Sequence, residues 1–452
     1  MAKAGESEAV AQALIERADD EDLWVRYQTA FALGEVVYGK SVPEELVKQA
    51  VAKLGGLLLD GPNNQWMRTA ALSSLAGHEA DLLATHPETD SAAWGELAGI
   101  VARRGRADEL AKVANRVEKE PNSKIARLVL NAWFADPSKG VREILADEDR
   151  QELQKQVAAR LKSAVDRAVD ADADLKARLA SINLLRLASF ETASDVFEEL
   201  ADGRQAPELQ QAAINLLREY DSPEVAAQLI EAFPRLTPSV RDLAAEALTS
   251  TTQNVNALLD AIEAGDFLPS SLPEARRQLL RESKNAAIRE RATKALASTV
   301  LAERAEVVER YRPSLETAGD VARGQALFKE HCAVCHKIGN VGQEVGPNLT
   351  AIKTRGQEFI LLNILDPSRE VNPEFLDYAI ITTEGVVKTG MIASESPTAV
   401  TLKRAEGVTE TVLRLDIEEM RSTGRSLMPD GFEKQLNPQQ MADVIAYLMS
   451  LE

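Results

Sequence analysis

Residues 323–336 read RGQALFKEHCAVCH, and this stretch decides how the last third of the chain is built. It holds both cysteines of the protein, Cys332 and Cys335, followed directly by His336. Two thiols on one helical turn can reach the two vinyl groups on one edge of a haem, and the next side chain then points at the iron. The pattern therefore predicts one covalently attached c-type haem with His336 as an iron ligand.

Two other uses of a Cys-x-x-Cys pair fit this sequence less well. A zinc site needs about four ligands, but His78 and His86 lie far away in the sequence and His331 directly precedes the motif. A redox-active dithiol is expected next to a βαβ pattern, which the surrounding sequence lacks. Two cysteines this close together also exclude a framework of structural disulfides.

The helix that leads into the motif resembles the N-terminal helix of class I cytochromes c, with Gly324 and Phe328 in the family's positions. In that family the helix packs against a C-terminal helix that carries an aromatic residue. Here QQMADVIAYLMSL supplies Ile445, Tyr447 and Leu448. Because glycine has no side chain, Gly324 would let the two helices approach closely.

A second part of the resemblance concerns the histidine. The stretch GPNL at 346–349 is similar to the family's sequence after the haem motif. The resemblance implies that the Pro347 carbonyl accepts a hydrogen bond from His336 Nδ1. Such a bond orients the imidazole and makes it a more basic ligand.

The sixth iron ligand is expected to be a methionine. The last 140 residues contain five of the seven methionines, which are Met391, Met420, Met428, Met441 and Met449. Met391 lies in an expected strand, Met420 follows an acidic helical turn, and the last two lie on the final helix, where methionine is usually core filler. Met428 lies in SLMPDGF, a loop before that helix, and a loop Met followed by Pro resembles the ligand loop of class I cytochromes. The resemblance implies Met428 as the distal ligand.

A more specific resemblance covers nearly all of the last 130 residues. The stretch from Gly324 to Leu448 resembles the haem-binding domain of many Planctomycetes and Verrucomicrobia proteins, in which an insertion separates the haem motif from the Met loop. Its landmarks here are FKEHCAVCH, EVGPNLT, ILDPSREVNPEF, TEGVVKTGMI, LDIEEM, SLMPDGF and ADVIAYL. In that family HEAT-like repeats precede the domain, and a β-propeller similar to sugar dehydrogenases precedes the repeats. This chain has the repeats and no propeller.

Amphipathic helices repeat through the first two thirds of the chain. SINLL at 181–185 recurs as AINLL at 213–217, and WVRYQTAFAL at 24–33 recurs as WMRTAALSSL at 66–75. A helix pair that cannot bury its apolar face alone stacks on its neighbours. The pattern resembles a HEAT-like α-solenoid, so the fold class is mostly α, with a generic helical bundle as the alternative.

The repeats end near Arg312-Pro313, which predicts three segments. We expect a repeat domain at 1–312, a linker at 313–319 and a class I cytochrome c-like domain at 320–452. Within the last segment, alternating β-branched residues predict a small antiparallel β insertion of three or four strands at about 377–415.

Composition and sequence features narrow the kinds of partner and the cellular location that we expect. The formal net charge of −19 disfavours binding to nucleic acid, and no apolar run is long enough for a transmembrane segment. The N-terminal residues lack the features of a signal peptide, whereas covalent haem implies a periplasmic or other extracytoplasmic place. We therefore expect a mature form or a piece of a larger precursor.

Three functions compete. The first is electron transfer through a haem with His/Met ligation, without catalysis of its own, in which a dehydrogenase on a missing N-terminal region or a partner subunit donates electrons to the haem and a further protein accepts them. The second is a haem peroxidase, which needs an open iron position and distal acid–base groups; Arg421 and Arg425 are the candidates. The third is a haem-based sensor or scaffold, because solenoids commonly bind proteins.

Overall fold

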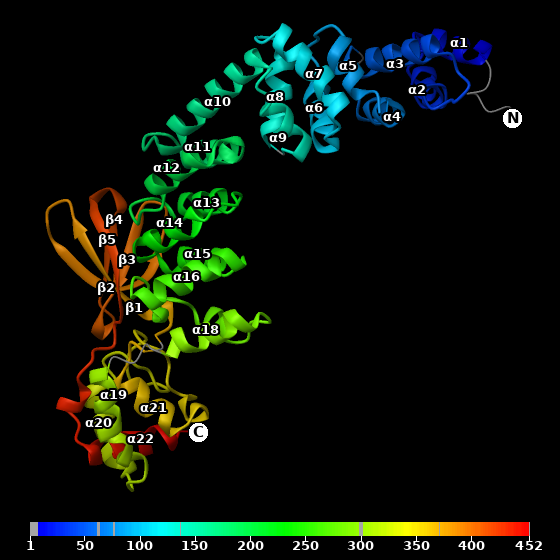
Figure 1. The fold of residues 1–452 in the computed structure, drawn as a ribbon. Helices are drawn as coiled ribbons and strands as arrows, with labels where there is room; N and C mark the ends of the chain where they lie inside the picture. The colour runs from blue at the N-terminus through cyan, green and yellow to red at the C-terminus, as the bar shows by residue number, and fades with distance from the viewer. Residues whose placement is uncertain are drawn as a thin grey trace. The chain divides into compact units, whose positions relative to one another are not determined.

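The structure is a computed structural model that describes residues 8–60, 64–75, 77–135, 137–297, 302–369 and 371–451. The chain divides into two compact units (Figure 1). The first unit contains Met1–Arg167 and Asn183–Ala188, and the second contains Ala168–Ile182 and Ser189–Glu452. The expected fold class is confirmed, since repeated helices are followed by the haem-motif region and an antiparallel sheet.

Paired helices build the first unit. They are α1 (Glu8–Arg17), α2 (Leu23–Val37), α3 (Glu44–Leu59), α4 (Gln65–Leu75), α5 (Glu79–Thr85), α6 (Ala93–Arg104), α7 (Ala107–Lys119), α8 (Lys124–Ala135) and α9 (Lys139–Leu145), and α10 (Gln151–Val169) and α11 (Leu175–Leu184) continue past them. Helix α2 packs on α4, α6 on α8 and α5 on α7. Alternate helices therefore stack on one another, as the repeated sequence predicts.

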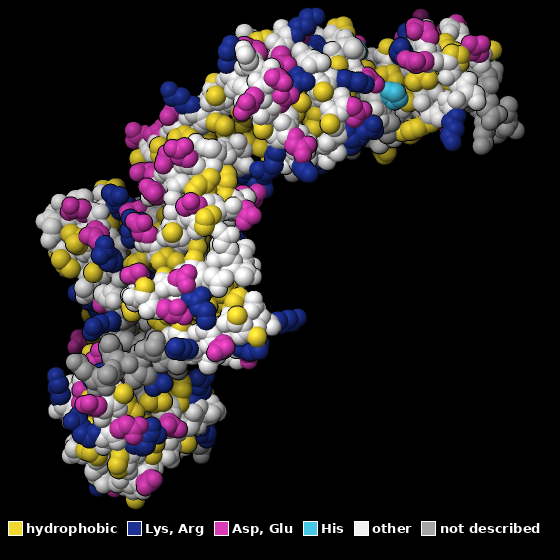
Figure 2. All heavy atoms as spheres, viewed as in Figure 1, with side chains coloured by type: hydrophobic (Ala, Val, Ile, Leu, Met, Phe, Trp, Pro, Cys, Tyr) yellow, Lys and Arg dark blue, Asp and Glu magenta, His cyan; other side chains and the backbone are white. Residues whose placement is uncertain are grey.

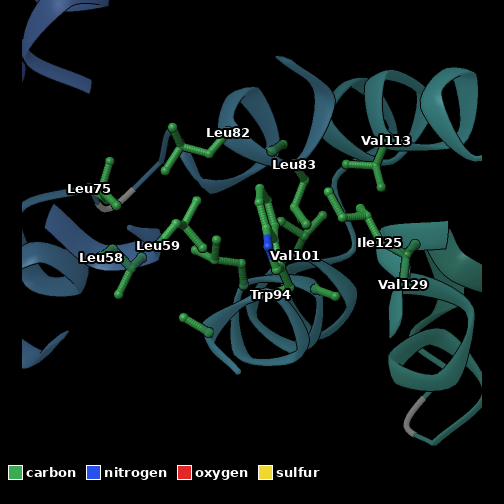
Figure 3. Close-up of a cluster of buried hydrophobic side chains, with 14 of the residues drawn as sticks. Leu58, Leu59, Leu75, Leu82, Leu83, Trp94, Val101, Val113, Ile125 and Val129 are labelled. Atoms are coloured by element: carbon green, nitrogen blue, oxygen red, sulfur yellow. The ribbon is translucent and has the colours of Figure 1, made fainter. Parts of the chain in front are cut away.

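The core of this unit is continuous from one helix pair to the next. Figure 3 shows leucines of α3, α4 and α5 and valines of α6, α7 and α8 gathered around Trp94, which is fully buried. Neighbouring pairs thus complete each other's apolar faces, which is the physical reason for stacking in repeat proteins.

The helical repeats continue in the second unit. Their helices are α12 (Phe190–Leu200), α13 (Pro207–Leu217), α14 (Glu224–Ala232), α15 (Pro238–Leu248), α16 (Thr252–Ala264), α17 (Glu274–Arg281) and α18 (Ala286–Ala297). The repeated positions Ile182 and Ile214 are both buried. Helices α13 and α15 each begin with a proline, whose fixed φ suits the first helical turn.

Four helices surround the haem motif. They are α19 (Ala302–Tyr311), α20 (Val321–His331), α21 (Gln357–Leu365) and α22 (Pro438–Met449). Helices α20 and α22 touch at Gly324, where an added Cβ would lie 1.9 Å from the backbone oxygen of Asp443. The rings of Phe328 and Tyr447 lie 5.6 Å apart beside this contact. The close approach that the sequence suggested at Gly324 is therefore present.

The packing favours an earlier start for this helical core than residue 320. Val308 and Tyr311 of α19 belong to the same buried cluster as Phe328 and Tyr447. The Tyr311 hydroxyl donates hydrogen bonds to the backbone oxygens of Glu433 and Leu436, at 2.9 and 2.7 Å. The expected linker at 313–319 begins with a 3₁₀ turn whose Ser314 is buried, so α19 packs with the haem-motif helices.

An antiparallel sheet lies between α21 and α22 in the sequence. Its strands are β1 (Leu376–Thr382), β2 (Val387–Glu395), β3 (Ala399–Lys403), β4 (Thr409–Leu413) and β5 (Ile417–Ser426), in the order β4-β3-β2-β1-β5. The prediction of three or four strands ending near 415 was wrong by one strand. Strand β5 runs through Met420, which the sequence had placed after a helical turn, and it pairs with β1 across two register shifts.

The sheet packs on the helical repeats of the second unit through buried polar side chains. The Tyr378 hydroxyl on β1 donates a 3.0 Å hydrogen bond to the backbone oxygen of Leu236. The Arg241 guanidinium on α15 lies 5.2 Å from the Tyr378 ring centre and 5.3 Å from that of Phe233. Burial raises the pKa of Tyr378 to about 12, so its hydroxyl stays protonated and can donate.

A second contact between the sheet and the repeats forms at the turn between α12 and α13. Arg414 donates to the backbone oxygen of Gly203 and pairs with Glu395 at 2.9 Å. A Cβ added at Gly203 would lie 2.2 Å from the methyl carbon of Met420. The sheet insertion is therefore held on one side by the repeats, which its place in the sequence did not predict.

The surface offers no single charged face in the view of Figure 2. Acidic and basic side chains alternate over the coloured part of that face, although the chain carries a net charge of −19. Among the described helices, none combines the length and apolar character needed to span a bilayer.

Candidate haem site

The haem motif forms one compact turn after α20. The amide of Cys332 donates to Phe328, and the amides of Cys335 and His336 both donate to the Cys332 backbone oxygen, at 3.1 and 2.9 Å. This turn follows α20, whose N-terminus is capped by Asp320 through the amide of Arg323. Helix geometry thus fixes the spacing of the two thiols, as the sequence suggested.

The environment of the two thiols keeps them protonated. Burial, with the neighbouring Cys335, raises the pKa of the Cys332 thiol to about 12, and burial also raises the pKa of Cys335. Redox-active dithiols and zinc ligands act as thiolates and have lowered pKa values. Among the described residues, no group of three or more His, Cys, Asp or Glu side chains could hold a metal ion.

His336 is oriented by the segment that follows the motif. Its Nδ1 lies 2.8 Å from the backbone oxygen of Pro347, so this nitrogen donates and Nε2 stays available for the iron. Burial lowers the pKa of His336, which favours the neutral imidazole that a metal requires. A Cβ added at Gly346 would lie 2.6 Å from the imidazole Cε1, so the glycine makes room for the ring.

A cavity of about 460 Å³ opens beside the motif. Cys332, Cys335, His336 and Met428 line it, together with apolar side chains of α20, α21 and α22. Met428 reaches it from the loop after β5, where its amide donates to Ser426 Oγ at 3.1 Å. The residues fit a haem, because an apolar cavity presents two thiols, an imidazole and a thioether sulfur together.

The other four methionines of this region lie elsewhere. Met391 and Met420 are buried in the sheet region, and Met441 and Met449 pack in the helical core. None of them lines the cavity. Of the five candidates, the structure brings only Met428 to the cavity that His336 lines.

The sequence analysis missed Arg355, the cation among the cavity-lining residues. Its guanidinium lies 4.1 Å from the ring centre of Phe359. Asn363, Asn372 and Ser426 add polar groups to the lining. A haem carries two propionates, so a cation and amide groups at an otherwise apolar cavity suit its charged edge. The available signal was a basic residue shortly after GPNL.

The two arginines proposed for a peroxidase are not in the cavity. Arg421 lies on β5 and pairs with Glu419 at 3.0 Å, and Arg425 lies 3.9 Å from Asp430. Both are exposed, and neither lines the haem cavity. These positions are those of solvated side chains on a strand.

Comparison with known proteins identifies the region around the motif. Residues 321–372 match the cytochrome c family. This match covers α20, the haem motif, GPNL and α21, and it establishes a cytochrome c domain after the helical repeats. A cytochrome c domain serves haem-based electron transfer.

Solved structures share only a limited likeness with this chain. A crystal structure of an engineered protein superposes with a TM-score of 0.29 at 17% identity, covering 65% of this chain and 92% of that one. The Cnd3–Cnd2 subcomplex of condensin from S. pombe gives a TM-score of 0.19 at 13% identity, covering 68% and 57%. Neither superposition is close enough to indicate a function. No curated protein matches the chain.

Proposed function

We propose that the last third of this chain carries electrons through one c-type haem, with His336 and Met428 as the axial ligands. The observation that carries the proposal is that these two side chains and both cysteines line one cavity. A bound haem would supply a one-electron iron couple. Because His336 and Met428 would both ligate the iron, the protein would leave it no place for a substrate, and this favours an electron carrier over a peroxidase.

Each residue has a separate task. Cys332 and Cys335 would attach the porphyrin by adding their S–H groups across its two vinyl groups. The Nδ1–H bond of His336 to Pro347 holds the imidazole in one tautomer and makes it more basic. A thioether is a soft ligand that favours ferrous iron, so Met428 would raise the reduction potential. Arg355 would offset the charge of a propionate.

The visible spectrum of the oxidised and reduced protein tests this function. We expect sharp low-spin c-type bands and the weak far-red band of methionine–iron ligation. Met428→Ala should abolish the far-red band and lower the midpoint potential, whereas Met441→Leu, a substitution at a buried methionine outside the cavity, should leave both unchanged. A high-spin wild-type spectrum that changes at once with carbon monoxide would refute methionine ligation.

We further propose that the electron donor is a dehydrogenase, on another polypeptide or on a further part of this one, and that the protein works in the periplasm or another extracytoplasmic place. The first point rests on the resemblance to haem-binding domains that accompany dehydrogenases, and the second on covalent haem attachment. Cell fractionation combined with cross-linking of the native protein would test both. A haem-loaded cytoplasmic pool would contradict the location, and cross-links to no oxidoreductase would contradict the donor.

A further inference from the structure

One residue of the sheet insertion has a strained backbone. Glu406, in the turn between β3 and β4, has φ 64° and ψ 8°, and it is the non-glycine residue with positive φ in the described chain. A side chain in this left-handed region is unfavourable unless surrounding contacts hold it there. The contacts of this turn therefore show which interactions hold Glu406 in this conformation.

The turn contacts the haem-attachment loop, which is the segment of residues 332–346. The Glu406 amide donates a 3.0 Å hydrogen bond to the backbone oxygen of Val334, which lies between the two cysteines. Next to it, Lys403 Nζ donates to the backbone oxygen of Glu344 at 2.7 Å. A Cβ added at Gly407 would lie 3.4 Å from the side-chain oxygen of Gln343, so the turn also touches the loop there.

The backbone oxygens of the attachment loop show why this contact matters. The Cys332 oxygen accepts from the amides of Cys335 and His336. The Ala333 oxygen accepts from the amide of Gln343, and the Cys335 oxygen accepts from the amides of Val345 and Gly346. These donors all belong to the haem-motif segment itself. The carbonyl of Val334 alone among the four is bonded by the sheet insertion, about 70 positions further along the chain.

We propose that the β3–β4 turn, residues 403–408, is a latch that positions the haem-attachment loop and covers part of that loop from water. This inference rests on the proposed function and deepens it. Glu406 and Lys403 act as positioning residues, because they touch the loop through its backbone and not the cofactor. The strain at Glu406 is held by the contact that aims its amide at Val334.

The latch predicts a change in the redox equilibrium. Opening it exposes the attachment loop to water, and solvent exposure favours the more highly charged oxidised iron. Lys403→Met removes the bond to Glu344 and keeps the side-chain length. Glu406→Pro removes the amide and cannot adopt a positive φ. Each should lower the ratio of reduced to oxidised protein at a fixed potential about threefold, which is about 28 mV at 59 mV per tenfold change.

Two further variants provide controls. Glu406→Gly keeps the amide and relieves the strain, so the potential should stay at the wild-type value. Thr411→Ala breaks the 3.0 Å hydroxyl contact with Thr401 in the same two strands without touching the attachment loop, and it should also leave the potential unchanged.

The experiment compares the full-length holoprotein and these four variants by redox titration and by hydrogen exchange of residues 330–346. The latch is supported if Lys403→Met and Glu406→Pro lower the potential and speed exchange while the controls do neither. It is overturned if all variants exchange and titrate like the wild type, or if Thr411→Ala acts as strongly as Glu406→Pro. Exchange reports the latch and the wild-type spectrum reports the haem function, so failure of one is distinguishable from failure of the other.

Discussion

Two contacts inside the second unit hold the parts around the haem motif, and they differ in what dominates them. Helices α20 and α22 are held mainly by close steric packing. Gly324 lets the two backbones approach, and Phe328 packs near Tyr447. The sheet meets the repeats through buried polar groups, because the Tyr378 hydroxyl donates to the Leu236 backbone oxygen and the Arg241 guanidinium lies over the Tyr378 ring. The first contact tolerates no added atom. The second depends on hydrogen bonds that water cannot replace.

The largest loss of stability should come from disrupting the close packing of α20 on α22. Gly324→Ala puts a Cβ 1.9 Å from the Asp443 backbone oxygen, and the helices must separate. We expect a loss of about 3 kcal/mol of local stability, measured by hydrogen exchange of α20 and α22. The control is Gly95→Ala on α6, where the nearest atom would lie 3.9 Å away. That substitution should instead stabilise its helix by about 0.5–1 kcal/mol. Equal effects on stability at both glycines would contradict the role of close helix packing at Gly324.

The next effect tests the polar contact. Arg241 donates to the backbone oxygens of Phe233, Leu236 and Pro234, all within 3.1 Å, and its pKa is lowered by burial. Arg241→Ala removes these donors and the packing of its stem, so we expect about 2 kcal/mol of destabilisation of the sheet and α15. Arg276→Ala, which loses a partly exposed 3.4 Å pair with Glu246, should cost less than about 1 kcal/mol. Both are measurable by urea unfolding.

A pH titration sharpens the comparison at the α20–α22 contact. Arg323 holds the pKa of Asp443 below its usual range through a 2.8 Å hydrogen bond. Because the folded pKa is depressed, the contribution to stability is present above the unfolded pKa and is lost as the pH falls through the folded value. Asp443→Asn should lose about 1 kcal/mol at neutral pH. The difference should shrink as the pH falls from the unfolded pKa of the carboxyl through its lower folded pKa, and a constant gap down to acid would contradict this coupling.

The smallest effect tests redundancy in the polar contact. The Leu236 backbone oxygen accepts from both the Tyr378 hydroxyl and Arg241 Nε. Tyr378→Phe therefore leaves that oxygen with a donor, and it should cost only about 0.5 kcal/mol in urea unfolding. In the Arg241→Ala background the same substitution leaves the oxygen without either donor, so its cost should rise. Additive effects would show that the two donors are independent.

Contacts that leave a recognisable local pattern in the sequence were predicted better than contacts that leave none. The contact at Gly324 was predicted because its helix resembles the N-terminal helix of class I cytochromes c, in which a glycine lets a second helix approach closely. The haem motif was recognisable because its geometry is set within one turn. Arg241 gave no signal, because its acceptors are backbone oxygens and the ring above it comes from a strand far along the chain.

Strand β5 was missed for a related reason. Glu418 and Glu419 favour helix when read alone, and the burial along β5 does not alternate cleanly. Its hydrogen-bonding partner β1 lies about 40 residues earlier, and the register shifts between the two strands hide the two-residue period. The site residue Arg355 was missed because only the fold shows that it lines the cavity.

The pairing of β1 with β5 has a consequence for folding kinetics. The chain leaves the haem region at Phe375 and returns at Leu427, whose amide donates to the Phe375 backbone oxygen at 2.9 Å. Met428 follows directly, so its arrival depends on the closure of a loop of about 50 residues, whereas the thiols and His336 are adjacent in sequence. Long-range strand pairing is slower than formation of a helical turn. The proximal side of the site therefore assembles first, and the methionine side waits for the sheet to close.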